Sequence, residues 1–494
     1  MRNKPVMPLR ELLSDSVKLS PGEQDILVRG LSLDSRKVAP GDAFFALQGT
    51  RQHGITFAPM ALAQGASVVL AEAPAPATSA AVPALWIDHL SDQLGLIADR
   101  FFGQPSQALR MIGVTGTNGK TSTVQLLAQA LSNAGYRAAT IGTLGSGIHG
   151  ALKTADRTTP DAISVHALLA DFRDEGASHV AMEVSSHALQ QGRVNGVQFD
   201  IAVFTNLTRD HLDYHASMQE YAAAKAKLFH WPNLSTAVIN IDDEFGRALL
   251  RNLSSTVQVL SFGIEAENCD LKAKNIQQSS SGLTFDLITP WGSGVVHTSL
   301  LGRFNVANLL GVAGCLGTLG FDFSQIKAAI AKMEPVPGRM NRLGGEVGLP
   351  LVVIDYAHTP DALEQVLSSL RLHSGQGRLI CVFGCGGERD NGKRPEMAAI
   401  AERLSNIAIV TDDNPRHEDG DKIVEQILAG FRYPQRVIIE RDRKAAIARA
   451  ISLAGAEDIV VIAGKGHEAY QETAGRRIPF DDLLVARNAL EAHA

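Results

Sequence analysis

Short runs of apolar residues recur along this chain, and most of them alternate with segments that have a helical pattern. MIGVTG precedes TSTVQLLAQALSNAG near residue 111, and LVVIDYAH, LICVFG, NIAIVTD and DIVVIAGKG repeat the arrangement after residue 350. Strands that are apolar throughout are buried on both faces, and helices between them connect parallel neighbours. The pattern therefore predicts an α/β protein built on doubly wound parallel sheets.

Two segments rich in proline, glycine and polar residues interrupt this pattern. They are FGQPSQALR at 102–110 and MEPVPGRMNRL at 333–343. Because the 494 residues suffice for about three domains, we expect domain boundaries at these segments. The predicted domains are residues 1–107, 108–337 and 338–494.

The composition excludes several classes of protein. A net charge of −6 gives no basic surface for nucleic acid, and four cysteines in so long a chain do not form a disulfide framework. The N-terminus lacks the apolar core of a signal peptide, and LLGVAGCLGTLG is too short to span a membrane. We expect a cytoplasmic protein with reduced thiols that neither binds nucleic acid nor enters a membrane.

A glycine-rich loop stands between a strand and a helix in MIGVTGTNGKTST, residues 111–123. Backbone amides and the N-terminus of the helix favour a phosphate chain there. Lys120 would neutralise the outer phosphates, and a hydroxyl of Thr121 or Ser122 would bind Mg²⁺. The common form of this loop has glycine where this chain has Val114. The alternative is a strand-to-helix turn with an incidental lysine.

Two further segments carry groups that suit a metal site. Glu183 ends the apolar strand HVAMEV, where a carboxylate needs either a partner or solvent. Residues 204–215, FTNLTRDHLDYH, contain Asn206, Asp210, His211, Asp213 and His215. Such a cluster is more often a hydrogen-bonded loop than a metal site, and Asp210 and His211 are its best functional candidates. By default the next two lysines, Lys225 and Lys227, are solvated.

Several of these motifs together resemble the Mur ligase family. GTNGKTS, EVSSHAL, FTNLTRDHLDYH, NVANLLG and DYAHTPDAL occur in the order of that family, over essentially the whole chain. The family consists of ATP-dependent amino-acid ligases of peptidoglycan precursor synthesis. Its phosphate loop is written TGTNGK(T/S), which accounts for Val114.

The resemblance implies an N-terminal UDP-binding α/β domain, a central P-loop ATPase-like domain with a parallel sheet, and a C-terminal Rossmann-like α/β domain. It also implies a reaction in two steps on UDP-MurNAc-L-Ala-D-Glu. ATP, with Mg²⁺, phosphorylates the terminal carboxylate, and the amine of an amino acid then displaces phosphate. We expect the chain to act as a monomer.

The resemblance also implies roles for single residues. The ATP-binding residues would be Gly116, Thr117, Asn118, Gly119, Lys120, Thr121, Ser122, Asn305, Asn308, Arg339 and Asp355. The catalytic residues would be Lys120, His211, Lys225 and Arg339. The metal ligands would be Thr121, Glu183, His211 and a carbamylated Lys225. A lysine accepts a carbamate only when its amine is partly neutral, so we expect Lys225 to be partly buried.

For the UDP-sugar peptide, the family implies contacts from both the N-terminal and the central region. These residues would be Leu33, Ser35, Thr158, Thr159, Ser185, Gln191 and Arg193. Thr50, Arg51 and Gln52 lie near the uridine motif but do not match the family. Locally, TTPD predicts only the N-cap of the helix DAISVHALLA.

Three loops near the C-terminus, FGCGGERDNGKRPEM, TDDNPRHED and AGKGHEAYQ, each follow an apolar strand. In an open parallel sheet, ligands bind beyond the carboxyl ends of the strands, so these loops are expected to converge. The alternative is three ordinary polar turns. The residues expected to bind the amino acid are Arg389, Asp413, Asn414, Pro415, Arg416, Gly464 and Glu468.

The mixed charges of these loops suit an amino acid with a zwitterionic far end. Arginines such as Arg416 and Arg389 can fork onto a carboxylate, and Glu468 can accept from an ammonium. Lysine-adding members of the family lack the arginine of DNPR, so the resemblance predicts meso-diaminopimelate. The alternatives are a lysine-adding ligase, a folylpolyglutamate synthetase, or a nucleotide-dependent switch protein without ligase activity.

Overall fold

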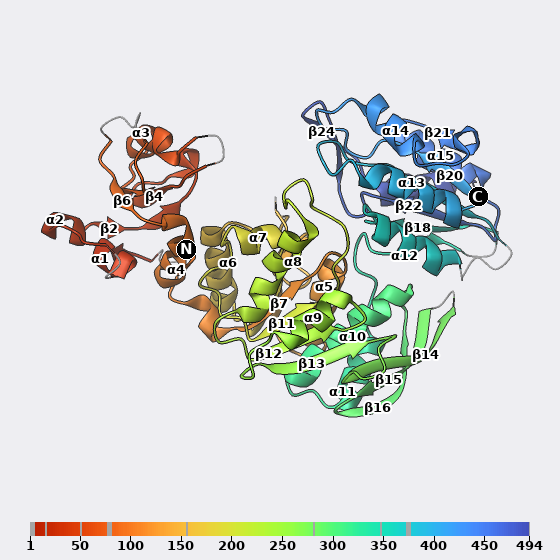
Figure 1. The fold of residues 1–494 in the computed structure, drawn as a ribbon, viewed down its shortest axis with the longest axis horizontal. Coiled ribbons are helices and arrows are strands. Elements are labelled where there is room, and N and C mark those ends of the chain that lie inside the picture. The colour runs from red at the N-terminus through yellow and green to blue at the C-terminus, as the bar shows by residue number, and fades with distance from the viewer. Residues whose placement is uncertain are drawn as a thin grey trace. The chain divides into compact units, whose positions relative to one another are not determined.

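The computed structural model describes residues 5–14, 17–49, 52–76, 82–154, 157–279, 282–345, 348–371 and 377–493. The chain divides into two compact units. The first comprises residues 1–113, 136–200 and 230–235, and the second comprises residues 114–135, 201–229 and 236–494. Each unit combines strands and helices (Figure 1).

The N-terminal part of the first unit is a parallel sheet covered on both faces. Its strands pair in the order β3 (Gly30–Ser32), β4 (Asp42–Ala46), β5 (Val68–Glu72) and β6 (Leu85–Ile87). In β4, Phe45 packs with α1 (Leu9–Leu13) and α4 (Leu90–Phe101), whereas Phe44 packs with α3 (Ala58–Ala63). The shorter elements of this part are β1 (Met7–Pro8), α2 (Pro21–Gln24), β2 (Leu27–Val28), η2 (Ser35–Lys37) and η3 (Gly54–Phe57).

The rest of the first unit carries three strands and two helices of the central region. The strand β8 (Ala138–Gly142) pairs in parallel with β10 (His179–Glu183) and antiparallel with β9 (Gly145–Ile148). The helices are α6 (Ala162–Asp174) and α7 (Ser186–Gln190). The predicted N-cap at TTPD is confirmed, and its residue is Asp161, whose side chain accepts from the Ser164 amide at 3.1 Å.

The second unit continues the central region. After β7 (Arg110–Thr115) leads into it, β11 (Ile201–Phe204), β12 (Thr236–Asn240) and β13 (Gln258–Gly263) pair in parallel. Then β14 (Leu271–Ser279), β15 (Gly282–Thr289) and β16 (Gly292–Thr298) form an antiparallel extension, which the sequence pattern did not indicate. The helices here are α5 (Lys120–Asn133), α8 (Met218–Ala226), α9 (Glu244–Arg251), α10 (Arg303–Thr318) and α11 (Phe323–Ala331).

The C-terminal sheet has the order β17-β18-β22-β19-β20-β21. All neighbours are parallel except β17 and β18. The strands are β17 (Asn341–Gly344), β18 (Leu351–Asp355), β19 (Leu379–Phe383), β20 (Ile407–Val410), β21 (Ile438–Ile439) and β22 (Ile459–Ala463). Because β18, β19, β20 and β22 are parallel, the loops that follow them leave from one edge of the sheet.

Helices cover both faces of this sheet (Figure 1). One face packs against α12 (Pro360–Arg371), α13 (Lys393–Leu404) and α14 (Gly420–Leu428), and the other packs against α15 (Arg443–Leu453) and α16 (Asp482–His493). A separate hairpin, β23 (Tyr470–Thr473) and β24 (Arg476–Pro479), follows β22. The C-terminal region is therefore the predicted α/β sheet.

The four cysteines do not form disulfides, as predicted. Cys315, Cys381 and Cys385 are buried, and burial raises the pKa of the Cys381 and Cys385 thiols to about 12. Within the described ranges, no helix has the length and apolarity needed to cross a bilayer.

The start of α11 offers a test of local stability. The side chain of Asp322 accepts from the Gln325 amide at 2.8 Å, and the Gln325 side chain accepts from the Asp322 amide at 3.0 Å. Asp322→Ala is expected to lower the free energy of unfolding by about 1 kcal/mol, since it removes this N-cap. Urea unfolding measures the loss. Asp322→Asn keeps a capping oxygen and should lose less, so equal losses would contradict the capping role.

Candidate functional site

The glycine-rich loop between β7 and α5 is hydrogen-bonded to the residues that follow β11. Thr205 donates to the Asn118 carbonyl at 2.6 Å, and the Asn118 amide donates to Asn206 Oδ1 at 2.8 Å. Gly116 has φ +150, and a Cβ there would lie 1.9 Å from Thr205 Oγ1. Gly119 has φ +85 and immediately precedes α5, so the loop ends at the N-terminus of a helix of 14 residues.

Two lysine ammonium groups meet at one carbonyl oxygen of this loop. Lys120 Nζ donates to the Gly116 carbonyl at 2.8 Å, and Lys225 Nζ donates to the same oxygen at 2.7 Å. Lys120 also donates to the Thr117 carbonyl at 2.8 Å. The charge of Lys120 beside a helix N-terminus makes this loop suitable for a polyanion.

Lys225 lies deep in the second unit, so its default assignment as a solvated lysine is wrong. Its side chain is 1% exposed, and its ammonium lies 4.3 Å from the centre of the Tyr221 ring. Burial and the nearby charge of Lys120 lower the pKa of Lys225 well below its usual value, although Asp210 opposes this shift. A lowered pKa favours the neutral form of the amine, which is the form that carbamylation requires.

The segment 204–215 does not gather its acids and histidines around one point. His211 Nε2 lies 3.4 Å from Asp210 Oδ2, while the Asp213 carboxylate lies 3.8 Å from Arg389 Nη1. Burial raises the pKa of Asp210, but the charges of His211 and other neighbours outweigh it and hold the pKa below its usual range. Asp210 is therefore a buried anion in the second unit.

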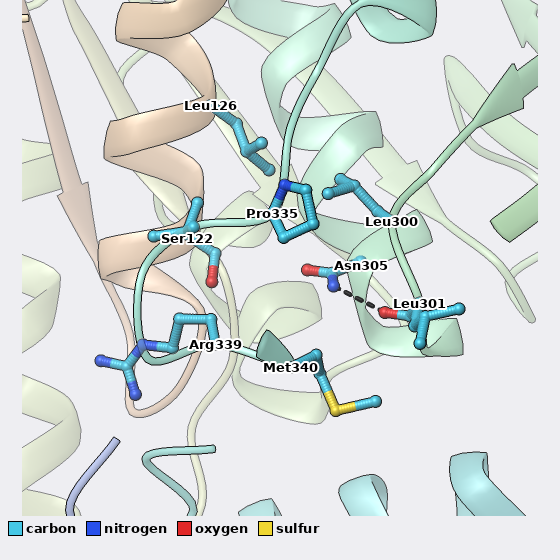
Figure 2. Close-up of a pocket in the computed structure, with 9 residues that line it drawn as sticks. Ser122, Leu126, Leu300, Leu301, Asn305, Pro335, Arg339 and Met340 are labelled. Atoms are coloured by element: carbon cyan, nitrogen blue, oxygen red, sulfur yellow. Dashed lines mark hydrogen bonds between the residues drawn. The ribbon is translucent and has the colours of Figure 1, made fainter. Parts of the chain in front are cut away.

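A small pocket opens beside the N-terminus of α10 (Figure 2). Asn305 and Arg339 are among its lining residues, together with Ser122 of α5. The Asn305 side chain donates to the Leu301 carbonyl at 2.7 Å, and Asn308 donates to Asn305 Oδ1 at 2.9 Å. The structure therefore brings both asparagines of NVANLLG close to the start of α5.

Arg339 lies at the N-terminus of α5, and Asp355 holds the backbone of the residue that follows Arg339. Arg339 Nη2 donates to Thr121 Oγ1 at 3.1 Å, and its guanidinium lies 4.5 Å from the centre of the Tyr356 ring. Asp355 accepts from the Met340 amide at 2.8 Å. Burial raises the pKa of Asp355, while Arg339 opposes the rise. Arg339 thus places a cation beside the hydroxyl of Thr121.

In the first unit, Glu183 is buried and bonded at the end of β10. Its carboxylate accepts from the Thr143 amide at 2.8 Å and from the Thr143 hydroxyl at 3.1 Å. The Thr143 and Thr158 hydroxyl groups lie 3.0 Å apart. Of the two possibilities for Glu183, a partner or solvent, the structure shows the first, since the residue is only 1% exposed. Its role as a metal ligand stays a prediction.

The residues of the first unit expected to bind the UDP-sugar peptide fall into two groups. Arg193 Nη1 donates to the Thr159 carbonyl at 2.9 Å, and Arg193 Nε donates to Gln191 at 2.9 Å. Ser185 caps α7, and its own amide donates to the Thr159 hydroxyl at 3.2 Å. These four residues therefore form one bonded cluster.

The second group follows β3, where Ser35 is buried and donates to the Met60 sulfur at 3.4 Å. Leu33 packs against the core that contains Phe45. Thr50 and Arg51 lie outside the described residues, so their contacts stay predictions.

The three C-terminal loops meet, as their parallel strands predicted. The Gly387 amide donates to the Asn414 carbonyl at 2.9 Å, and Arg416 Nη1 donates to the Gly387 carbonyl at 2.6 Å. Asn414 Nδ2 donates to Glu468 Oε2 at 2.8 Å. The structure therefore joins the loops after β19, β20 and β22, whereas the ligand roles of their residues stay predictions.

Arg416 has an unusual backbone conformation. Its φ of +54 lies in the left-handed region, which is uncommon for a residue other than glycine. The hairpin β23–β24 holds it there, because the Arg416 amide donates to the Glu472 carbonyl at 3.0 Å and the Ala474 amide donates to the Arg416 carbonyl at 2.5 Å. The surrounding structure thus fixes the direction of the Arg416 side chain.

Sequence reasoning missed several residues that shape these loops. Thr205 supports the phosphate loop, Tyr221 covers Lys225, and Lys465 lies buried in the loop after β22, where it contacts the loop after β20. Tyr221 precedes Lys225 by one helical turn, so an aromatic side chain on the same helix face was an available signal. Lys465 adjoins Gly464, but one lysine between two glycines carries no signal of burial.

The described side chains offer Mg²⁺ few ligands of their own. Among the described residues, no group of three histidine, cysteine, aspartate or glutamate side chains is placed to hold a metal ion. Magnesium in phosphoryl-transfer sites is typically bound by one or two carboxylates together with substrate phosphates. The hydroxyl of Thr121, at the phosphate loop, is the hard oxygen ligand that such a site uses, so these residues fit a metal that arrives with the nucleotide.

Three family models match the chain. They are described as "Mur ligase family, catalytic domain" at residues 27–102, "Mur ligase middle domain" at 114–316, and "Mur ligase, glutamate ligase domain" at 338–466.

Curated relatives match it over almost its whole length. UDP-N-acetylmuramoyl-L-alanyl-D-glutamate–2,6-diaminopimelate ligase of Xanthomonas campestris is 58% identical over 487 residues, covering 98% of this chain and 97% of the relative. The protein of the same name from Xylella fastidiosa is 55% identical, with 98% of each chain covered. A solved structure of a ligase of that name is 38% identical, covers 99% of both chains and has a TM-score of 0.71.

Proposed function

Because the chain belongs to the Mur ligase family, we propose that it joins meso-2,6-diaminopimelate to the D-glutamate of UDP-MurNAc-L-Ala-D-Glu. The predicted α/β fold with three domains is confirmed by this membership and by the solved relative. The exact limits 1–107, 108–337 and 338–494 stay predictions. The names of the relatives support the choice of substrate, since they carry it at 55% and 58% identity.

The loop between β7 and α5 supports ATP as the co-substrate. Residues 116–122 offer backbone amides at a helix N-terminus, and Lys120 adds a positive charge beside them. Arg339 lies at the same helix end, where it donates to Thr121. We assign Lys120 and Arg339 to the phosphates of ATP, and Asn305 and Asn308 to the adenine side.

The reaction needs two steps, because a carboxylate is a poor electrophile. The terminal carboxylate oxygen attacks the γ-phosphorus of ATP, the bond to ADP breaks, and an acyl phosphate forms. The neutral amine of the amino acid then attacks the acyl carbon, and phosphate leaves. The protein's contribution is mainly positioning and positive charge near the transferring group, which Lys120 and Arg339 would provide.

We propose Mg²⁺ as the metal, held through Thr121, Glu183, His211 and a carbamylated Lys225. When bound, it neutralises the charge that develops on the phosphate oxygens. The carbamate forms when the neutral Lys225 amine attacks carbon dioxide and loses a proton, so a buried neutral amine becomes an anion. The low pKa of Lys225 supports this assignment.

The observation that carries the choice of amino acid is the meeting of the three C-terminal loops. They bring Arg416, which donates to the Gly387 carbonyl, into one cluster of loops with the carboxyl groups of Asp413 and Glu468. A zwitterionic far end needs cations for its carboxylate and acceptors for its ammonium, whereas the far end of lysine has no carboxylate. We therefore favour diaminopimelate over lysine.

The remaining assignments concern the other substrate and the setting. We assign Leu33 and Ser35 to the uridine side, and Thr158, Thr159, Ser185, Gln191 and Arg193 to the sugar peptide. We place the reaction in the cytoplasm, within peptidoglycan precursor synthesis, and propose that the chain works as a monomer.

Phosphate release from ATP tests the proposed function. We expect release by the wild-type protein to require both UDP-MurNAc-L-Ala-D-Glu and meso-diaminopimelate, because each step consumes one of them. L-lysine, D-alanine and glutamate serve as competing amino acids in separate reactions. Release with lysine but not diaminopimelate would contradict the predicted specificity. Slow ATP hydrolysis that no amino acid alters would indicate a nucleotide-dependent switch instead.

A further inference from the structure

Lys465 is fully buried in the loop that follows β22. Its side chain is 0% exposed, and a buried ammonium is costly unless it is paired and hydrogen-bonded. Its Nζ donates to Asn414 Oδ1 at 3.0 Å and to Glu468 Oε2 at 3.0 Å. It also lies 3.8 Å from Asp413 Oδ1. Its partners are therefore three residues expected to bind the amino acid.

These bonds fix the side chain of Asn414. Asn414 Oδ1 accepts from Lys465 and also from the Glu472 amide at 2.9 Å, which fills the two acceptor positions of an amide oxygen. Asn414 Nδ2 donates to Glu468 Oε2 at 2.8 Å. Both acceptor positions of the Asn414 oxygen are therefore used by protein donors, and none is left for a ligand. Asn414 instead holds Lys465 and Glu468 in place.

The same bonds hold two carboxylates near each other. Asp413 and Glu468 come from different loops, and like charges brought together repel. The ammonium of Lys465 lies between them and offsets this repulsion. Glu468 Oε2 then has two fixed donors, Lys465 Nζ and Asn414 Nδ2, which set the direction of its carboxylate.

We propose that Lys465 is a positioning residue for the far ammonium of the amino-acid substrate, acting through Glu468 and Asn414. It joins the loop after β20 to the loop after β22 and holds the acceptor carboxylates in the arrangement that receives the ammonium. This role rests on the proposed function. Lys465 would support the residues that bind the amino acid without touching the substrate itself.

Steady-state kinetics of Lys465→Met in the full-length protein test this role. We expect the KM for diaminopimelate to rise about tenfold to a hundredfold, since small misplacements of binding groups have effects of that size. The KM values for ATP and for the UDP-sugar peptide should stay within about twofold, because those substrates do not depend on Glu468. Lys444→Met, at an exposed lysine of α15, is the matched control and should change none of the three.

A double-mutant cycle with Glu468→Gln tests whether Lys465 acts through Glu468. If it does, the double variant should have about the same KM for diaminopimelate as Glu468→Gln alone. If the two substitutions instead raise the KM for diaminopimelate by factors that multiply, the proposal is overturned. It is also overturned if Lys465→Met leaves this KM unchanged or raises all three KM values equally.

Lys465→Gln keeps an N–H donor for Asn414 without the charge, and it replaces Lys465→Met under the same criteria if that variant does not fold. A wild-type protein that does not use diaminopimelate would overturn the proposed function. An active wild type with an unaffected Lys465 variant would overturn only the role of Lys465.

Discussion

Lys225→Ala is expected to remove nearly all ligase activity, and short carboxylic acids such as formate or acetate are expected to restore part of it. The alanine variant loses the group that would carry the carbamate, so the site lacks one carboxylate. A small acid can enter the space left by the lysine and supply that carboxylate. Phosphate release with all three substrates, with and without added acid, measures both effects.

Rescue by carboxylic acids distinguishes a carbamate on Lys225 from a simple hydrogen-bonding role of its amine. Lys225 also donates to the Gly116 carbonyl, so its removal alone would loosen the phosphate loop. A carboxylic acid cannot replace that N–H donor at neutral pH, but it can replace a carbamate. Loss of activity without rescue would therefore favour the hydrogen bond, and full activity would mean that the carbamate is absent or idle.

Lys227→Ala is the matched control, because Lys227 lies two residues further along the same short segment. We expect its activity to stay close to that of the wild type and to be insensitive to added acids. A carbonyl carbon signal from ¹³C-labelled carbon dioxide, present in the wild type and absent in Lys225→Ala, would identify the carbamate directly.

The contrast between these two lysines shows where sequence reasoning stops. In AAAKAKLF the two lysines look alike, and the local sequence predicts that both are solvated. Burial of Lys225 comes from its meeting with Gly116, which is 109 positions away in the chain, and from Tyr221 on the same helix face. Long-range contacts of this kind leave only the weak local signal of an aromatic residue one turn earlier.

The C-terminal sheet, in contrast, was predictable because its signals are local. Apolar runs of four to five residues specify the buried strands, and parallel pairing then places their carboxyl ends at one edge. That rule alone predicts that the loops of Gly387, Asn414 and Glu468 meet. It does not predict which side chain contacts which, and Lys465 was missed for this reason.

The antiparallel strands β14, β15 and β16 were missed because their pattern is different. They alternate buried and exposed residues rather than forming continuous apolar runs, which is typical of a sheet with one solvated face. A pattern of continuous apolar runs therefore does not include them. They extend the sheet away from the phosphate loop, so the prediction of the site did not depend on them.

Arg416→Ala is expected to weaken the use of diaminopimelate by roughly 2–5 kcal/mol, since the far carboxylate of the substrate would be buried without its cation. The corresponding rise in KM is about thirtyfold or more. A guanidinium has five N–H donors, so the bond from Nη1 to the Gly387 carbonyl is compatible with a second bond to a carboxylate. The KM for ATP should not change.

The backbone at this position makes the substitution a clean test. Arg416 has φ +54, and alanine meets the same steric cost there as arginine, so the hairpin contacts through the Arg416 amide and carbonyl can persist. Arg416→Lys keeps the charge but loses the fork, and an intermediate KM is expected. Arg436→Ala removes an exposed arginine of the same region and should leave the KM for diaminopimelate unchanged. If Arg416→Ala behaves like Arg436→Ala, the carboxylate of the substrate is held elsewhere, and Arg389 becomes the next residue to replace.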